Sequence, residues 1–393
     1  MAQSYQDLLA AAREHVPEVQ VPDLAARIAA GDRPVVIDVR EQAEWDEGHI
    51  PGSVHIPRSF LESRIGGVAR EHDAEIVLSC ASGQRSLLAG ATLRAMGFAN
   101  VSSLAGGFSR WKQNGNHYDV PQTLTADQRA RYSRHLLIPE VGEEGQLKLL
   151  NSRVLMIGAG GLGSPAAYYL AAAGVGTIGI VDDDVVDPSN LQRQIIHTTD
   201  RVGMNKGESA KIAIEALNPD VAVNVHPFRV DKHNILDLLA GYDLILDGAD
   251  NFPTRYLLND AALMTRTPLV HASILRFEGH ATVFTPYEGP CYRCLFPEPP
   301  PPELAPACGE AGVLGILPGV MGNLQANEAL KVLLGIGEPL VGRLLIYDAL
   351  DMAFTELKLR RDPECPACGP HAELEFKDYE AWCAGVGRHP VPA

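Results

Sequence analysis

The chain has 393 residues, 46% of them hydrophobic and 21% charged, and its 33 basic and 49 acidic side chains give a formal net charge of −16. This length exceeds what one hydrophobic core usually organises, so we expect two domains of unequal size. No run of lysine or arginine is long enough to follow a phosphate backbone, which argues against a nucleic-acid partner.

The amino terminus predicts a short amphipathic helix and not a secretory signal. Asp7, Arg13 and Glu14 fall where a signal peptide needs an unbroken apolar core. The longest apolar stretch, residues 168–181, contains three glycines and is shorter than the roughly 18 residues that a membrane span needs. Seven cysteines, four of them in two Cys-x-x-Cys pairs, favour metal and thiol chemistry in a reducing compartment. We therefore expect a cytoplasmic protein with no membrane partner.

A small α/β domain is expected first. Apolar runs at 35–39 and 76–80 predict two buried strands, with helical patterns between and after them. This alternation is typical of a parallel α/β unit. After Trp111 the chain becomes polar, rich in turn-forming residues and free of periodicity. The expected division begins with these three parts: an N-terminal helix over 1–20, a first domain over 21–115 and a linker over 116–126.

The segment CASGQRS, residues 80–86, follows the second of these strands and precedes a helical pattern. Backbone N–H groups at such a helix start should face the Cys80 sulfur, and the helix dipole should lower the pKa of the thiol. Arg85 should close the loop. Four residues separate Cys80 from Arg85, whereas the loops of protein tyrosine phosphatases have five, so this loop suits a terminal sulfur better than a phosphate. A buried cysteine at a helix start is the alternative.

The motifs on either side of this loop resemble those of the rhodanese family. DVREQAEWDEGHIPGSVHIP, residues 38–57, is similar to the opening motif, and LAGGFSRW, residues 104–111, to the closing one. The resemblance implies that Cys80 carries a persulfide, which an upstream donor must load.

A second α/β domain is expected over residues 127–393. A helix containing Arg131 and Arg134 precedes a strand, a glycine turn, a helix and a strand, which together form a βαβ unit. The proline-rich stretch 297–306 should be an extended crossing and not core. The expected strands are 153–158, 177–182, 221–225, 243–247, 269–272, 280–284 and 343–347, with the helix of the βαβ unit over 164–173.

The glycine turn GAGGLGS fits the pattern GxGxxG through Gly158, Gly160 and Gly163. Between a strand and a helix, such glycines let the backbone approach phosphate groups while the first amides of the helix face the anion. Asp182, at the end of the next strand, is placed to bind a ribose hydroxyl. This much also fits an NAD(P)-dependent oxidoreductase, and tight packing of the strand on the helix would also explain the glycines.

Three charged positions further along favour nucleotidyl transfer over hydride transfer. Arg193 and Lys206 can neutralise charge that develops on the α-phosphate and on the leaving phosphates. Asp250 can hold a Mg²⁺ ion through one oxygen. Each of them alone could be an ordinary solvated charge, so the prediction depends on their combination.

From about Asp127 to Gly369 the chain closely resembles the ThiF/MoeB/HesA branch of the ubiquitin-activating (E1-like) adenylyltransferases. The matching segments are RYSRHLL, GAGGLGSPAAYYLAAAGVG, DPSNLQRQIIH, LILDGADNFPTRYLLN, GPCYRCLFP and CPACG. The resemblance implies an α/β fold: a Rossmann-like adenylating domain with a mixed sheet, here preceded by the small rhodanese domain. It also implies ATP and Mg²⁺ as ligands, and a ubiquitin-like sulfur carrier of the MoaD or ThiS type as partner.

The family's site residues are carried over position by position. Arg134 of the opening helix is expected to enter the neighbouring subunit's site, which implies a homodimer. The expected ATP site combines the glycine turn, the first aspartate of the next strand, the asparagine-to-arginine segment, the lysine and the Asp-Asn pair. Its members are Gly158, Gly160, Gly161, Gly163, Asp182, Ser189, Asn190, Leu191, Gln192, Arg193, Lys206, Asp250 and Asn251.

The two Cys-x-x-Cys pairs, Cys291 with Cys294 and Cys365 with Cys368, provide four thiolates, the number that a closed tetrahedral Zn²⁺ site takes. The related family carries zinc on the same positions, and reduced core or redox cysteines are the alternative. Cys308 belongs to neither pair. In E1-like enzymes a cysteine on this crossover loop can form a covalent intermediate, so Cys308 is a catalytic candidate, with an ordinary loop thiol as the alternative.

We therefore expect an enzyme that adenylates the C-terminal glycine of the carrier and then transfers sulfur from a Cys80 persulfide to form a thiocarboxylate. An NAD(P)-dependent oxidoreductase with a regulatory rhodanese domain and a noncatalytic docking scaffold are the alternatives. Carriers of this kind serve molybdenum cofactor and thiamine biosynthesis, among other pathways. In familiar fusions the rhodanese domain comes second. Its first position here leaves open whether Cys80 serves its own subunit or a neighbour.

Overall fold

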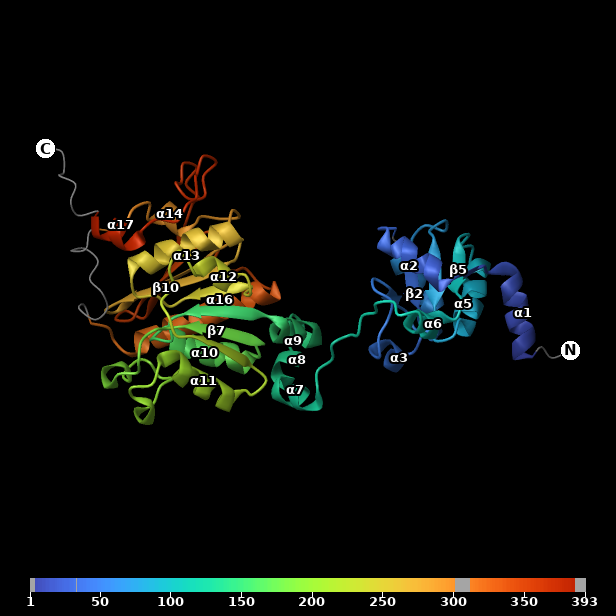
Figure 1. Cartoon of the computed structure of the whole chain (residues 1–393), viewed down its shortest axis with the longest axis horizontal. Helices are drawn as coiled ribbons and strands as arrows, with labels where there is room; N and C mark the ends of the chain where they lie inside the picture. The colour runs from blue at the N-terminus through green and yellow to red at the C-terminus, as the bar shows by residue number, and fades with distance from the viewer. Residues whose placement is uncertain (1–3, 33, 301–311, 386–393) are drawn as a thin grey trace. The chain divides into compact units, whose positions relative to one another are not determined.

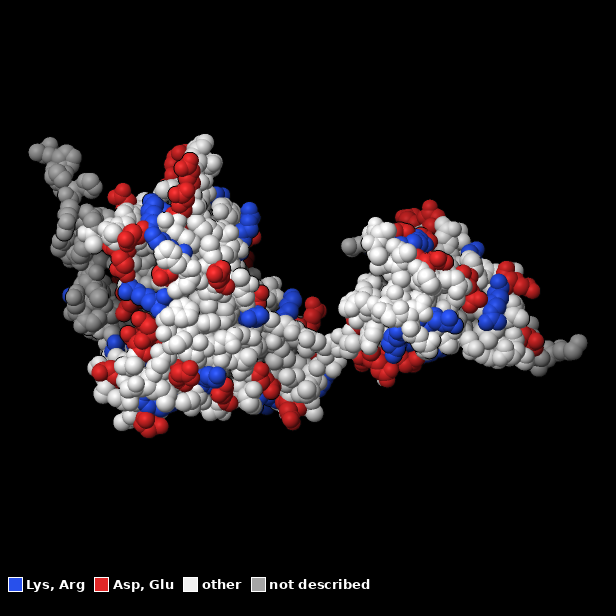
Figure 2. Space-filling view, viewed as in Figure 1, with Lys and Arg blue, Asp and Glu red and all other residues white. Residues whose placement is uncertain are grey.

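The structure is a computed structural model that describes residues 4–32, 34–300 and 312–385. The chain divides into two compact units, residues 1–123 and 124–393 (Figure 1). In the described ranges, no helix has both the length and the apolar character needed to cross a membrane. Acidic and basic side chains are intermixed on the face of each unit that Figure 2 shows.

The first unit is built on a five-stranded sheet in which every neighbouring pair is parallel. The two strands that the sequence predicted lie side by side in the sheet and are almost wholly buried, as expected for strands covered on both faces. In spatial order the strands are β1 (Glu18–Val19), β5 (Val101–Leu104), β4 (Ile76–Ser79), β2 (Val35–Asp38) and β3 (Val54–His55).

Helices surround this sheet. The amphipathic pattern at the amino terminus forms α1, which Ser4 and Asp7 begin with a reciprocal capping box. Leu9 and Ala12 of α1 pack against Leu87 of α5, which explains the apolar stripe of the first helix. The helices of this unit are α1 (Tyr5–His15), α2 (Val21–Ala29), α3 (Gln42–Asp46), η1 (Arg58–Phe60), α4 (Leu61–Val68), α5 (Gln84–Ala95) and α6 (Gly107–Gln113).

The second unit contains an eight-stranded mixed sheet, which confirms the predicted α/β fold with a mixed sheet. Its strands from β10 to β8 in spatial order run parallel, whereas β11, β12 and β13 extend the sheet in antiparallel fashion. In spatial order they are β13 (Ala353–Lys358), β12 (Arg343–Asp348), β11 (Glu278–Phe284), β10 (Leu269–Leu275), β9 (Leu244–Asp247), β6 (Arg153–Ile157), β7 (Thr177–Val181) and β8 (Ala222–His226).

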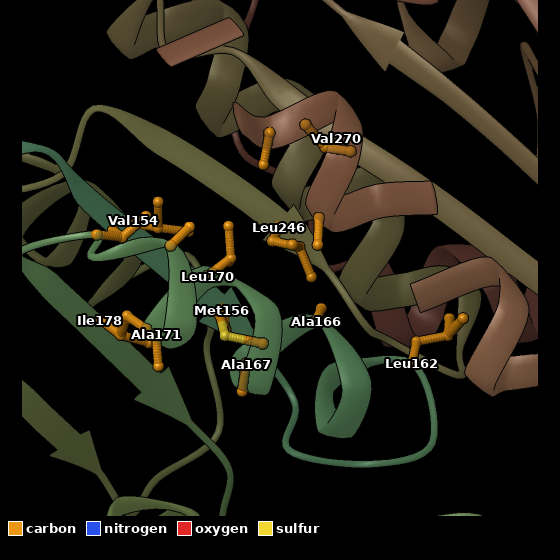
Figure 3. Close-up of a cluster of buried hydrophobic side chains, with 14 of the residues drawn as sticks. Val154, Met156, Leu162, Ala166, Ala167, Leu170, Ala171, Ile178, Leu246 and Val270 are labelled. Carbon is orange, nitrogen blue, oxygen red and sulfur yellow. The ribbon is translucent and has the colours of Figure 1, made fainter. Parts of the chain in front are cut away.

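Two apolar layers enclose this sheet. Residues of α10, α11 and α16 pack against one face and residues of α12, α13 and α17 against the other. Figure 3 shows part of the first layer, where Ala166, Ala167 and Leu170 of α10 lie against Met156 and neighbouring strand residues. The helices of the unit are α7 (Ala126–Arg131), α8 (Ser133–Leu136), α9 (Gly142–Asn151), α10 (Gly163–Ala173), η2 (Pro188–Asn190), η3 (Thr199–Arg201), α11 (Lys206–Leu217), α12 (Ile235–Leu239), α13 (Phe252–Thr265), α14 (Tyr292–Leu295), α16 (Ile316–Leu334) and α17 (Tyr379–Gly385).

One predicted helix differs from the observed structure. The helix expected to carry both Arg131 and Arg134 is two short helices, α7 and α8, which meet at Tyr132. The ring of Tyr132 is buried beside Gly174, where any Cβ would collide with it, and its hydroxyl accepts a hydrogen bond from Asn218 at 2.9 Å. Burying this ring bends the chain between the two arginines.

Candidate active sites

A pocket opens at the carboxyl ends of β6, β7 and β9, the edge at which parallel α/β sheets bind ligands. It is lined by eight of the residues that the sequence assigned to ATP, and by further side chains from the loops after β8 and β9. The eight predicted residues are Gly158, Gly160, Gly161, Asp182, Arg193, Lys206, Asp250 and Asn251.

The glycine turn combines both explanations that the sequence left open. Gly158 lines the pocket with φ of +96°, a left-handed conformation that glycine adopts without strain. Gly163 is not among the lining residues, and a Cβ there would lie 2.2 Å from the Gly158 carbonyl oxygen. Gly163 therefore allows close packing of the turn, whereas Gly158, Gly160 and Gly161 line the pocket.

Both backbone polar groups of Ala159, within this turn, are hydrogen-bonded to side chains. Its N–H donates to Asp182 Oδ2 at 2.8 Å, and its carbonyl oxygen lies 2.9 Å from His197 Nε2. Because a carbonyl oxygen only accepts, Nε2 carries the proton, and Nδ1 accepts from the Ser209 hydroxyl at 2.9 Å. Burial lowers the pKa of His197 to about 4, so the ring is neutral near pH 7.

Asp182 itself is buried enough that desolvation raises its pKa, against the opposing effect of the two amides it accepts from, those of Ala159 and Asp184. Its carboxylate therefore shapes the glycine turn in this structure. The ribose contact expected from the sequence stays a prediction.

The two predicted cations come from different elements. Lys206 is the first residue of α11 and is only 7% exposed, with Nζ 2.6 Å from Asp184 Oδ2. Arg193 follows the turn at η2, where its Nη1 donates to the Ser189 carbonyl at 3.2 Å. The residues that precede Arg193 in the predicted segment do not line the pocket; they are Ser189, Asn190, Leu191 and Gln192. Asn190 instead accepts from the Asp187 amide and so orders the turn that carries Arg193.

Asp250 and Asn251 follow β9 and have different local roles. Asn251 Oδ1 accepts from the Thr254 amide at 2.9 Å and so caps α13. Its Nδ2 lies 3.3 Å from Asp250 Oδ1, so the cap also orients the neighbouring carboxylate. Sequence reasoning missed Arg255, which lines the same pocket and donates to the Ala249 carbonyl at 3.1 Å. Its position one helical turn after the cap residue Asn251 could have identified it as a pocket residue.

Arg134 does not line the pocket of its own chain. It is exposed on α8, and within the described part of the chain it forms no ion pair. Its neighbours hold the helix in place: His135 Nδ1 lies 2.9 Å from Gln146 Oε1, and Arg131 donates to the Leu217 carbonyl. Leu137 and Ile138, directly after α8, are also exposed, at 72% and 43%.

The four cysteines of the two Cys-x-x-Cys pairs lie together. The Sγ of Cys291 is 3.8 Å from that of Cys294 and 3.6 Å from that of Cys365, and Cys294 Sγ is 3.5 Å from Cys368 Sγ. A tetrahedral zinc with Zn–S bonds of about 2.3 Å requires sulfurs about 3.8 Å apart. The donor set and its spacing therefore fit Zn²⁺, with no side left open for a substrate.

In the first unit, Cys80 lies directly after β4 and its side chain is fully buried. Three donors approach its sulfur: the Gly83 amide at 3.1 Å, and the Ser86 amide and hydroxyl, both at 3.4 Å. Such a set of donors stabilises negative charge on sulfur. Two of these donors are backbone N–H groups that face the sulfur, as the sequence predicted.

The closing motif around Gly107 supports this loop. Phe108 donates its amide to the Cys80 carbonyl at 2.7 Å, and Ser109 donates to the Ala81 carbonyl at 3.0 Å. A Cβ on Gly107 would lie 2.2 Å from the Cys80 carbonyl oxygen. Gly107 is therefore needed for close packing against the cysteine loop.

Arg85 forms a bidentate ion pair with Glu44, with nitrogen–oxygen distances of 2.7 and 2.6 Å. This pair lowers the pKa of Glu44, since the guanidinium stabilises the carboxylate. Glu44 lies in the opening motif, 41 positions before Arg85, and sequence reasoning did not anticipate the pair. Cys308, the other catalytic candidate, lies outside the described residues. Cys383 is half-buried on α17, where burial raises its pKa to about 11.

Comparison with known proteins gives two family matches. The ThiF family model matches residues 132–367, and the rhodanese-like domain model matches residues 20–114. The SAMP-activating enzyme E1 of Haloferax volcanii is 54% identical over 264 residues, which are 67% of this chain and 97% of that protein. The sulfur carrier protein adenylyltransferase of Thermus thermophilus is 51% identical over 265 residues, 66% of this chain and 98% of that protein.

The name of a third relative combines both activities. The adenylyltransferase and sulfurtransferase MOCS3 of Drosophila sechellia is 50% identical over 266 residues, 67% of this chain and 59% of that protein. Among solved structures, Escherichia coli MccB with MccA-N7isoASN aligns with a TM-score of 0.55 and 23% identity, over 61% of this chain and 75% of that one. At this identity the likeness concerns the fold alone, and it agrees with the architecture described above.

Proposed function

The chain belongs to the ThiF family, as its sequence predicted, and from this premise we propose that it adenylates the C-terminal glycine of a ubiquitin-like sulfur carrier and then converts that carboxylate to a thiocarboxylate. It is an adenylyltransferase with sulfurtransferase activity. One observation supports the adenylating role above all others: Lys206, Arg193 and Asp250 line one pocket with the glycine turn.

The first step is an attack of the carrier's terminal carboxylate oxygen on the α-phosphorus of ATP. The new P–O bond forms as the bond between the α- and β-phosphates breaks, and pyrophosphate leaves with the electron pair. The carboxylate becomes a mixed anhydride with AMP, whose leaving group is far better than oxide. Lys206 and Arg193 stabilise the negative charge that grows on the phosphate oxygens as this bond breaks.

The glycine turn and Asp182 hold the nucleotide in this proposal. The pocket amides at Gly160 and Gly161 would face the phosphates, and Asp182 would contact the ribose. Mg²⁺, when bound, supplies further neutralisation of the phosphate oxygens. The Asp250 carboxylate fits such a hard cation, because it lies at the pocket and its only contact among the described residues is one amide nitrogen of Asn251.

Zn²⁺ has a structural role in this proposal. Its four proposed ligands join the segment at α14 to the chain before α17, so the ion would fix the carboxyl-terminal part of the unit against α13. With all four positions taken by sulfur, no site remains for substrate.

Sulfur transfer begins from a Cys80 persulfide that an upstream donor supplies. Its outer sulfur attacks the acyl carbon of the adenylate, AMP leaves, and an acyl disulfide with Cys80 remains. A second thiolate then attacks the Cys80 sulfur. The S–S bond breaks, the carrier leaves as a thiocarboxylate, and Cys80 is left in a disulfide with the attacking thiol. Cys308 is the chain's own candidate for that thiolate, and a cellular thiol would serve equally.

A homodimer completes the proposal. Arg134 is exposed and does not line its own pocket, and Leu137 and Ile138 after it are also exposed, as expected of a residue that acts in a second copy. The arginine would then add a third cation to the partner's phosphate site.

The separation of the two activities tests the proposal. The variant Cys80→Ala should lose thiocarboxylate formation while it keeps carrier-dependent ATP–pyrophosphate exchange at the wild-type rate. Lys206→Met should lose both, because sulfur transfer needs the adenylate. A Cys80→Ala protein that loses pyrophosphate exchange as well would contradict the assignment of one activity to each unit.

A further inference from the structure

A buried acid–imidazole pair lies beneath the loop that carries Asp250. Asp247 is the last residue of β9 and His271 is its register partner on β10, and they are 1% and 5% exposed. His271 Nδ1 lies 2.6 Å from Asp247 Oδ2. Because the carboxylate accepts, Nδ1 carries the proton. Neither residue lines the nucleotide pocket.

The second carboxylate oxygen of this pair reaches the pocket loop. Asp247 Oδ1 accepts from the Ala249 amide at 2.9 Å, and Ala249 is a lining residue next to Asp250. The Ala249 carbonyl in turn accepts from Arg255, and the Gly248 amide donates to the Ile157 carbonyl at 2.9 Å. Three backbone groups of the short loop, the Gly248 amide and the amide and carbonyl of Ala249, are thus hydrogen-bonded, and Asp247 supplies the acceptor for one of them.

The surroundings of His271 allow it little movement. Tyr292 packs edge-on against the imidazole with ring centres 5.4 Å apart, and Phe284 lies at 5.9 Å. Gln325 of α16 donates to the Asp247 carbonyl at 2.7 Å. The charged and titratable groups around His271 are Asp247, Tyr292, Arg255 and His280, and burial lowers the pKa of the imidazole in spite of the carboxylate. The ring is therefore held as a neutral donor with one orientation.

An apolar pair of the same volume would fill this space without the cost of burying a carboxylate, so stability does not explain the pair. What the pair adds is a fixed orientation of the groups that it contacts. The imidazole fixes which way the Asp247 carboxylate faces, and the carboxylate fixes the Ala249 amide. We propose that His271 and Asp247 are positioning residues that hold the Asp250 loop in its reactive geometry for adenylation.

This inference rests on the proposed adenylating function, and a set of three variants tests it. His271→Leu keeps apolar volume but removes the donor, whereas His271→Asn keeps a donor nitrogen at nearly the same place. Glu328→Gln is the matched control, because Glu328 is also buried and also accepts a backbone amide, that of Leu340 at 2.7 Å, but lies away from the pocket.

The readouts are kcat and the KM for ATP in pyrophosphate exchange, with purified Gly-Gly-ended carriers of the MoaD and ThiS type as probes, and thermal unfolding of each variant. A displacement of about 1 Å at a reacting group costs about 100-fold in rate, so H271L should lose kcat on this order with KM for ATP changed less than about threefold. H271N should retain kcat within about threefold, and E328Q should lower only the unfolding temperature.

The inference is wrong if folded H271L exchanges pyrophosphate at the wild-type kcat, or if H271N loses as much as H271L. Should H271L fail to fold, the kcat values of H271N and D247N are compared instead, because D247N keeps the volume and loses one of the two accepted hydrogen bonds. D247N should then lose kcat while H271N retains it, and equal wild-type kcat in both would contradict the inference. A wild-type protein with no exchange activity on any carrier would overturn the proposed function instead. The wild-type reaction alone therefore distinguishes this failure from failure of the inference.

Discussion

Replacement of Lys206 by methionine is the most informative perturbation of the nucleotide site. Methionine keeps most of the volume of the lysine stem and removes only the charge. The Lys206 side chain is nearly buried at the start of α11. Among the described residues, its ammonium forms an ion pair with the exposed carboxylate of Asp184 at 2.6 Å. That ion pair itself contributes little to stability, because Asp184 is 67% exposed.

The kinetic effect should be much larger. A charge developing on a phosphate oxygen about 5 Å from the ammonium interacts with it by about 3 kcal/mol at an effective dielectric constant of about 20. A loss of this size from the transition state lowers the rate by about 150-fold. We therefore expect Lys206→Met to reduce kcat of pyrophosphate exchange about 100-fold, with a small change in unfolding temperature.

Lys211, on the same helix, provides the control. It is partly exposed, and its one ion pair with the residues that the structure describes is to Glu215, one turn away at 3.8 Å. Lys211→Met should therefore leave the exchange rate unchanged. If Lys206→Met kept more than about a third of the wild-type kcat, or if both variants lost activity equally, the charge of Lys206 would not be what stabilises the transition state.

Three further predictions address metal, pH and subunit. Purified wild-type protein should contain one zinc per chain, and Cys365→Ser should lose it with a fall in unfolding temperature of about 10 °C; an unchanged zinc content would exclude the four-cysteine site. The folded-state pKa of His197, about 4, lies below the 6.5 of the unfolded chain, so its contribution is complete above pH 6.5 and is lost as pH falls towards 4. This amounts to about 3 kcal/mol at most in urea unfolding, and His197→Gln should flatten the dependence. Arg134→Ala should be inactive alone. A mixed dimer of Arg134→Ala with Lys206→Met has one site with both residues intact if Arg134 acts in the other subunit, so it should show up to about half of the wild-type activity. No recovery in the mixed dimer would mean that Arg134 acts in its own subunit.

The strands of the second unit could be predicted well because their chemistry is local. The parallel strand β6, for example, is a continuous apolar run from Val154 to Ile157, as expected when both faces of a sheet are covered. The pattern fails where a strand is exposed or contains polar residues. All six residues of β13 are exposed, and β5 of the first unit is buried but contains Ser102 and Ser103, so neither shows an apolar run.

That eight of the residues assigned to ATP would line one pocket was also predictable, since the carboxyl ends of parallel strands meet at one edge of the sheet. This brings residues from the ends of β6, β7 and β9 into one pocket although they lie far apart in sequence. The side chains that support the site were not predictable in this way. His197 contacts the glycine turn 38 positions before it, and Glu44 pairs with Arg85 across 41 positions. Such partners have no local signal, because tertiary packing alone brings them together.

The most direct test of the central claim is the detection of a carrier–AMP anhydride. Purified protein, Mg²⁺ and ATP would be mixed with each Gly-Gly-ended carrier in turn, and the carrier's intact mass measured together with the release of pyrophosphate. We expect one carrier to gain the mass of an adenylyl group with equal release of pyrophosphate, in Cys80→Ala as in the wild type. Pyrophosphate release without an adenylated carrier, or no reaction with any carrier, would contradict it.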